Sequence, residues 1–166
     1  MSVFTGQEAK QLQVILDFFI DEICTSEEKE ELEKASCFDR YMKQLKAGVP
    51  MGVLDLDFNY KKQVELYDLD VSKEIWRRDT VFNSMDEMRT RNSINLHGKY
   101  ADFLEKLGED KPEIAEYKDQ LLSAGAIGVG AQSMLLMFPE KFETNDVGIQ
   151  LLIAVHYLTF FEGFDH

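Results

Sequence analysis

The chain has 166 residues, of which 45% are hydrophobic, and these numbers favour one compact domain that covers residues 1–166. It contains 18 lysines and arginines against 31 aspartates and glutamates, so its formal net charge is −13. A field of this sign repels nucleic-acid phosphates and anionic lipid headgroups, and we therefore expect no direct nucleic-acid binding.

Two threonine–glutamate pairs near the N-terminus have the spacing of a capping box. In Thr5–Glu8 and in Thr25–Glu28, each side chain can accept a hydrogen bond from the other residue's backbone amide, which begins a helix. Apolar residues recur at helical spacing after each box: Leu12, Ile15, Leu16, Phe19 and Ile23 in the first helix, and Leu32, Ala35, Phe38, Met42 and Leu45 in the second. Gly48 and Pro50 are expected to end the second helix.

The pattern changes between residues 52 and 71. Leu54, Leu56 and Phe58 are separated by single residues, and Val64 and Leu66 continue this alternation after a turn at residues 59–62. A period of two is typical of a strand. We predict a small β-hairpin near residues 52–71, packed on the helices because two strands alone are only marginally stable.

The next part of the chain is predicted to be helical. Ser72 is expected to cap a short helix that extends to Phe82. A third capping box at Ser84–Glu87 is expected to begin a helix that ends at Leu107–Gly108.

Two more helical regions follow. The first begins at Pro112 and extends to Phe138, either as one long helix or as two helices joined at residues 125–130. Asn145 is expected to cap the last helix, which runs to about Glu162. Together these patterns predict a mainly α protein, a compact bundle of five or six helices with the small hairpin.

Three glycines, Gly125, Gly128 and Gly130, interrupt the region from residue 112 to residue 138. Each costs about 1 kcal/mol relative to alanine inside a helix, so something must offset them. A stripe of small residues that includes Ala124 and Ala126 would let another helix approach closely; the alternatives are a helix break and a ligand pocket with a glycine floor. The order of the glycines does not match a nucleotide-binding loop.

The two cysteines, Cys24 and Cys37, lie 13 residues apart at positions predicted to be on different helices. No CxxC motif or suitably spaced histidine accompanies them, so we expect neither a disulfide framework nor a zinc site.

Targeting and membrane signals are not evident. Residues 1–5 contain no basic region before an apolar run, so we expect no signal peptide and a cytoplasmic location. The most apolar stretches, residues 124–138 and 147–161, are each about 15 residues long, short of the roughly 20 that a spanning helix needs. We therefore expect no membrane segment.

Three aspartates in the predicted hairpin are candidate metal ligands. Asp55 and Asp57 share one face of the first predicted strand and Asp68 is expected near them, so their carboxylates could hold Mg²⁺ or meet a cationic partner. An EF-hand is excluded because Tyr60 stands where the calcium loop requires glycine and Leu66 where it requires glutamate. The alternative is a solvated strand face.

Four of the five arginines fall within 15 residues, close to the only tryptophan. Guanidinium groups bind carboxylates and phosphates through paired hydrogen bonds, so this cluster is a candidate anion or partner site. Its members are Trp76, Arg77, Arg78, Arg89 and Arg91. The alternative is neutralisation by ion pairs with nearby acids, which are Glu74, Asp79, Asp86 and Glu87.

Acidic residues are concentrated around the turn between the first two predicted helices. Such a surface would attract a basic protein, and complementary charge raises the rate of encounter and specificity more than affinity. The alternative is a solvated helix face. The candidate partner-binding residues are Glu27, Glu28, Glu30 and Glu31.

The histidines and cysteines indicate no recognisable catalytic group. His156 has apolar neighbours at helical spacing and is interpreted as a hydrogen-bonded core residue, without an ExxH or HExxH motif. His97, which is expected beside Asp102 or Arg89, gives an acid–base hypothesis. No GxSxG motif is present, so we interpret the chain as a non-enzyme and expect no cofactor.

These observations favour a non-enzymatic acidic binding protein, of the inhibitor, immunity, antitoxin or adaptor kind, that engages a basic protein partner. The second hypothesis is a small-molecule or metal-binding protein, or an enzyme of unfamiliar type, with a site between the helices and residues 52–71. The third hypothesis is a structural subunit of a homo-oligomer. For the second, the residues to test first are Asp55, Asp57, His97 and Arg89.

Overall fold

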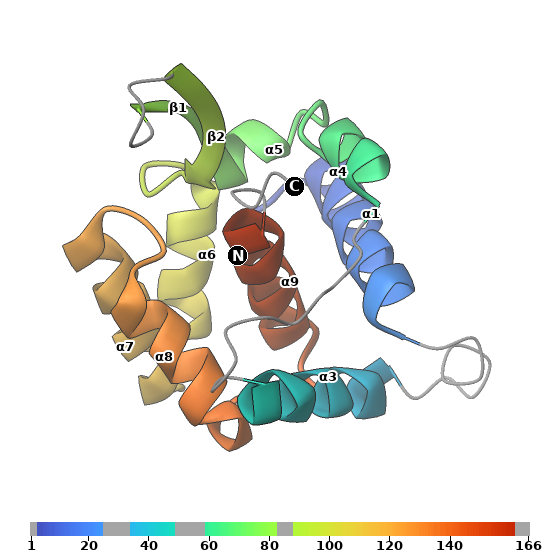
Figure 1. Cartoon of the computed structure of the whole chain (residues 1–166), viewed down its shortest axis with the longest axis vertical. Coiled ribbons are helices and arrows are strands. Elements are labelled where there is room, and N and C mark those ends of the chain that lie inside the picture. The colour runs from blue at the N-terminus through green and yellow to red at the C-terminus, as the bar shows by residue number, and fades with distance from the viewer. Residues whose placement is uncertain (1–2, 25–33, 49–58, 83–87, 162–166) are drawn as a thin grey trace.

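The computed structural model describes residues 3–24, 34–48, 59–82 and 88–161, and it is mainly helical with one two-stranded sheet (Figure 1). This confirms the predicted fold class. The helices are α1 (Gly6–Ile23), α3 (Lys34–Gly48), α4 (Tyr60–Leu66), α5 (Ser72–Ile75), α6 (Lys99–Leu107), α7 (Pro112–Ala124), α8 (Val129–Met137), the short 3₁₀ helix η2 (Pro139–Lys141) and α9 (Val147–Phe161). The strands are β1 (Trp76–Phe82) and β2 (Met88–Ile94).

The last helix, α9, lies in the middle of the bundle, with α1, α3, α6 and α8 around it (Figure 1). Every residue from Ile149 to Leu158 is buried. A helix that is apolar on all sides is stable only when other elements cover all of its sides. The core of the protein is therefore built around α9.

The cap of α9 differs from the prediction. Asp146, not Asn145, accepts a hydrogen bond from the Gly148 amide at 2.7 Å, and Lys111, just before α7, forms an ion pair with Asp146 at 3.0 Å. Partial burial raises the pKa of Asp146, but the bonds from Lys111 and from the helix amides outweigh it and lower the pKa overall. A carboxylate suits this position because it also faces the positive end of the helix dipole.

The first capping box is confirmed in α1. Thr5 Oγ1 accepts from the Glu8 amide at 3.3 Å, and Glu8 accepts from the Thr5 amide at 2.7 Å. All five apolar positions predicted for this helix are buried. In α3, Phe38, Met42 and Leu45 are buried, and the helix ends at Gly48 as predicted. The second capping box lies outside the described residues.

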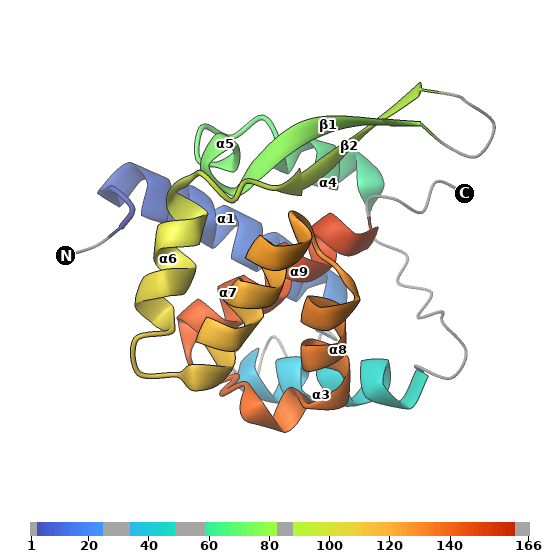
Figure 2. The same ribbon diagram turned by 90° about the vertical axis from the view of Figure 1, so that its left-hand side faces the viewer.

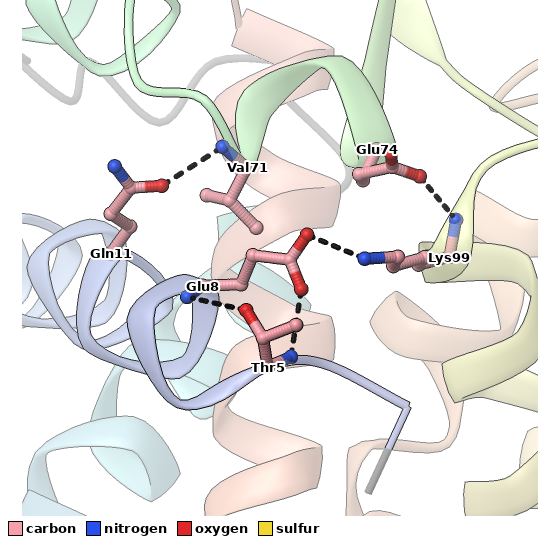
Figure 3. Close-up of polar contacts among 6 residues, drawn as sticks. All are labelled: Thr5, Glu8, Gln11, Val71, Glu74 and Lys99. Carbon is pink, nitrogen blue, oxygen red and sulfur yellow. Dashed lines mark hydrogen bonds and ion pairs between the residues drawn. The ribbon is translucent and has the colours of Figure 1, made fainter.

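Glu8 also joins α1 to the start of α6 and, through it, to α5 (Figure 3). Its carboxylate pairs with Lys99 Nζ at 2.6 Å, and the backbone amide of Lys99 donates to Glu74 at 3.0 Å. Glu74 thus satisfies an amide of the first turn of α6, which Gly98 at the cap position cannot do. A Cβ atom at Gly98 would lie 2.3 Å from the Glu74 carbonyl oxygen, so only glycine permits this approach. Gln11 accepts from the Val71 amide at 3.0 Å and adds a second link from α1.

The hairpin lies at a different place in the chain from the one predicted. Residues 60–66 form helix α4, whose cap Asn59 accepts from the Lys62 amide at 3.3 Å, and residues 52–58 lie outside the described residues. Helical spacing turns Gln63 and Leu66 inward and leaves Val64 57% exposed. The alternation in the sequence therefore reflects no sheet in the described part of this segment.

The strands form where helix was predicted. Helix α5 ends at Ile75, and β1 pairs antiparallel with β2 in a register that runs from Trp76↔Ile94 to Phe82↔Met88. The capping box at 84–87 lies outside the described residues, but residues 88–94, which follow it, are strand. Pairing between distant residues overrides a local helix signal here, because strand formation depends on cross-strand contacts.

The glycine-rich region is a helix break. Gly125 has a left-handed backbone (φ 69°) after the end of α7, and Gly128 stands at the cap position of α8. A Cβ atom at Gly130 would meet only the side chain of Gln120, whose Oε1 would lie 2.1 Å away at the end of an exposed, flexible side chain on α7. The helix break proposed from the sequence is thus present, and the stripe of small residues stays a prediction.

The two cysteines form a disulfide, which corrects the prediction from their spacing. Cys24 follows α1 and Cys37 lies in α3, with their Cα atoms 5.5 Å apart. Both side chains are buried. Sequence spacing does not report how closely two helices approach, and here the ends of α1 and α3 meet.

Opening this disulfide is expected to lower the free energy of unfolding by about 3 kcal/mol, because a closed loop of this length restricts the unfolded chain. Urea unfolding with and without reductant measures the difference. The Cys24→Ala/Cys37→Ala variant is the control, since reductant should not change its midpoint. An equal midpoint for the wild type with and without reductant would contradict the bond.

Replacing Glu8 with glutamine is expected to destabilise the protein at neutral pH and to have less effect in acid. The hydrogen bond from Lys99 and that from the Thr5 amide lower the pKa of Glu8 from 4.5 to about 2. The stability that this carboxylate contributes is therefore present above pH 4.5 and is lost as the pH falls through about 2. Urea midpoints at pH 7, 4 and 2.5 test this.

The matched control is Glu116→Gln, an exposed glutamate on α7. If Glu8→Gln shifts the midpoint at pH 7 no more than Glu116→Gln does, the ion pair contributes no stability.

Candidate functional site

Several residues proposed from the sequence lie outside the described residues. These are Glu27, Glu28, Glu30, Glu31, Asp55 and Asp57. Asp68 is exposed in the turn after α4, and His97 is exposed in the turn before α6, where its amide donates to Asn95. Within the described ranges, no group of three His, Cys, Asp or Glu side chains could hold a metal ion. The hypotheses of a metal or metabolite site near residues 52–71 and of a homo-oligomer therefore stay predictions.

The arginine cluster is brought together on one hairpin. Arg77 and Arg78 lie in β1, and Arg91 lies in β2 directly opposite Asp79. Side chains directly opposite one another share a face of the sheet, so Arg77, Asp79 and Arg91 share one face, and Arg78 lies on the other. Arg89 stands opposite Val81 in the register. Figure 2 shows the hairpin lying across the top of the helical bundle.

Trp76 anchors this hairpin at its base. Its side chain is buried, and its indole N–H donates to Thr159 Oγ1 of α9 at 2.6 Å. The ring also packs edge-on against Tyr67, with centroids 5.0 Å apart and planes at 87°. The tryptophan thus fixes the hairpin on the helices, and Arg77, Arg78 and Arg91 form its exposed part.

Only part of the expected neutralisation of the arginines takes place within the described residues. Arg77 pairs with Asp79 at 3.2 Å and donates to the Gly125 carbonyl at 3.4 Å. Glu74 binds the backbone of Lys99 instead of an arginine. Among the described residues, none forms an ion pair or hydrogen bond with Arg78 or Arg91. Within the described part of the chain, these two exposed guanidinium groups therefore keep their donors available to an external anion.

A cavity of about 270 Å³ lies at the base of the hairpin. One wall is β2, from Arg91 to Ser93; the second is the loop between α7 and α8, at Ala126 and Ile127; the third is the end of α9. Figure 2 shows these elements meeting beneath β2. The glycine break between α7 and α8 makes this space, because the chain leaves the helix at Gly125 and re-enters one at Val129. Sequence patterns do not bring these three walls together.

His156 is a core residue, as predicted. Burial lowers its pKa from 6.5 to about 3, so the ring is neutral at physiological pH. Nδ1 lies 2.8 Å from the Tyr117 hydroxyl, and Nε2 contacts Gln132 Oε1. Because the Gln132 oxygen can only accept, the proton is on Nε2, and Nδ1 accepts from Tyr117. The ring is therefore fully hydrogen-bonded and has no nitrogen left for other chemistry.

The negative charge of the chain is unevenly distributed. The described residues contain 20 acidic and 17 basic residues, so 11 of the 31 acids and one of the 18 bases lie in the segments outside them. The described body is thus nearly balanced, and the hairpin strands, with four arginines and one aspartate, are a basic region on it.

Comparison of the chain with protein-family models, with curated proteins and with solved structures finds no match. Among the described helices, none is both long enough and apolar enough to cross a membrane. The geometry of the hairpin and its cavity is therefore the basis for a functional proposal.

Proposed function

We propose that this chain is a non-enzymatic binding protein that engages acidic groups of a partner protein through the β1–β2 hairpin. The observation that carries the proposal is that Arg78 and Arg91 are exposed and unpaired among the described residues, on a hairpin that Trp76 holds in place. Guanidinium groups bind carboxylates with paired hydrogen bonds, and a backbone that is already held in place loses less freedom on binding than a mobile one.

The charge of the rest of the chain supports a selective interaction. A net charge of −13 repels extended polyanions at long range, so a partner must present its acidic groups locally to the hairpin. Exposed charges at the rim of an interface act mainly on the rate of association and on its salt dependence. We expect a complex that forms rapidly at low salt and weakens as salt is added.

Replacing the two exposed arginines of the proposed binding surface, as Arg78→Gln/Arg91→Gln, is expected to release the partner at lower salt. The measurement is a pull-down from the source cell's lysate with purified chain as bait, washed at rising salt and read by mass spectrometry. The matched control is Lys62→Gln/Lys73→Gln, which removes the same charge from exposed positions on α4 and α5. The role of the hairpin would be overturned if the wild type and both variants retained the partner to the same salt concentration. It would also be overturned if none of the three retained a partner.

A second candidate is the binding of a basic protein by the acidic segment between α1 and α3. Residues 25–33 contain five glutamates and one lysine. The Cys24–Cys37 disulfide closes the chain around this segment. Such closure restricts the free chain and lowers the entropy lost on binding.

Reversing Glu27, Glu28, Glu30 and Glu31 to lysine is expected to abolish capture of a basic partner without unfolding the chain. Far-UV circular dichroism and the urea midpoint check the fold, and the same salt-graded pull-down measures capture. A basic protein that the reversed variant still retains would exclude this segment as its binding surface.

A further inference from the structure

We infer that the cavity beneath β2 is a binding site for a small organic carboxylate with an apolar stem. This inference goes beyond the proposed function, because the exposed part of the hairpin can engage a partner with the cavity empty. It rests on Arg91, which lines this cavity together with three apolar residues, Ala126, Ile127 and Phe160, and three uncharged polar ones, Asn92, Ser93 and Thr159.

The size of the cavity limits the ligand. A volume of about 270 Å³ holds on the order of ten non-hydrogen atoms at about 30 Å³ each, as in a liquid. Small-molecule sites are typically concave and mostly apolar, with a few polar groups that fix the orientation of the ligand. Ala126, Ile127 and Phe160 supply the apolar surface here, and the Phe160 ring is stacked at 16° on the buried ring of His156. This wall is therefore supported from the core.

Arg91 determines the sign of the charge that the cavity accepts. Its nearest acid in the sheet register is Asp79, which is already paired with Arg77 at 3.2 Å. Helix α8 begins two residues after Ile127 without a side-chain cap, so its first-turn amides add positive potential nearby. The carbonyl groups at the end of α9 oppose this positive potential. The Thr159 hydroxyl, which lies in the same wall, is already hydrogen-bonded, because it donates to Val155 and accepts from Trp76. A full charge on Arg91 outweighs the partial charges of a helix end.

A carboxylate fits this arrangement better than a phosphate. A single guanidinium group can make two parallel hydrogen bonds to one carboxylate, which leaves the rest of the ligand for the apolar walls. A phosphate would bring more charge and more acceptors than one arginine satisfies. Because this arginine is also exposed to solvent, we expect a dissociation constant of about 1 mM.

The only tryptophan of the chain reports on this cavity. Trp76 donates its indole N–H to Thr159, and Thr159 is part of the cavity wall. Titration with 3-phenylpropionate, followed by the emission of Trp76, is expected to give a saturable change. The uncharged probe 3-phenylpropanamide should bind at least about tenfold more weakly, because it lacks the charge-assisted bonds to Arg91.

Arg91→Gln is expected to weaken 3-phenylpropionate binding at least about tenfold. The matched control is Arg78→Gln, which removes an arginine from the other face of the same hairpin and should bind like the wild type. Equal urea midpoints for the two variants exclude a folding defect. As a second readout, the amide NMR signals of Ser93 and Ile127 should shift during the titration, so that binding without an emission change is still detected.

Three results would each overturn the inference. They are no saturable change in either readout with the wild type, equal binding of the acid and its amide, and binding that Arg91→Gln leaves unchanged. Tighter binding of inorganic phosphate than of 3-phenylpropionate would overturn the assignment to a carboxylate. None of these results bears on partner capture, in which Arg78 and Arg91 are tested together.

Discussion

The burial of α9 on all of its sides is the constraint on which the rest of the architecture depends. An apolar helix in the centre needs a covering element in every direction, and α1, α3, α6 and α8 surround it (Figure 1). Its last turn needs polar partners as well as cover. The Leu158 carbonyl accepts from Gln63 at 2.8 Å and from Tyr67 at 3.3 Å, both on or next to α4, and Thr159 accepts from Trp76. Helix α4 and the hairpin are therefore held on the bundle by the end of α9.

The anchoring of the hairpin explains how a two-stranded sheet is stable here. Two strands alone are marginal in water, so the free energy that orders β1 and β2 must come from their base. Trp76 and Ile94 face each other in the register and are both buried. Farther along the strands, Arg78 and Thr80 are exposed, as is Thr90 opposite. The hairpin thus has a buried apolar base and a basic part that is exposed to solvent. This arrangement places arginines on the surface of a chain whose net charge is negative.

Local patterns predicted the parts of the fold that depend on local interactions. The capping box of α1, the buried face of that helix and the end of α6 at Leu107–Gly108 follow from residues within a few turns of one another. The hairpin could not be found in this way, because β1 and β2 are rich in arginine and lack apolar alternation, and their pairing is between distant residues. The disulfide was missed for the same reason. For the site, the sequence identified the arginines, but the cavity has walls from three distant segments.

The burial of His156 also determines how the protein responds to acid. The folded state keeps this ring neutral down to a pKa of about 3, whereas the unfolded chain takes up a proton near its ordinary pKa of 6.5. Proton uptake by the unfolded state lowers the free energy of unfolding as the pH falls from 6.5 towards 3, by at most about 1.4 kcal/mol per pH unit. This loss begins at a higher pH than the loss at Glu8. Of these two groups, the imidazole in the core is therefore the one whose contribution to stability decreases first as the surroundings become acidic.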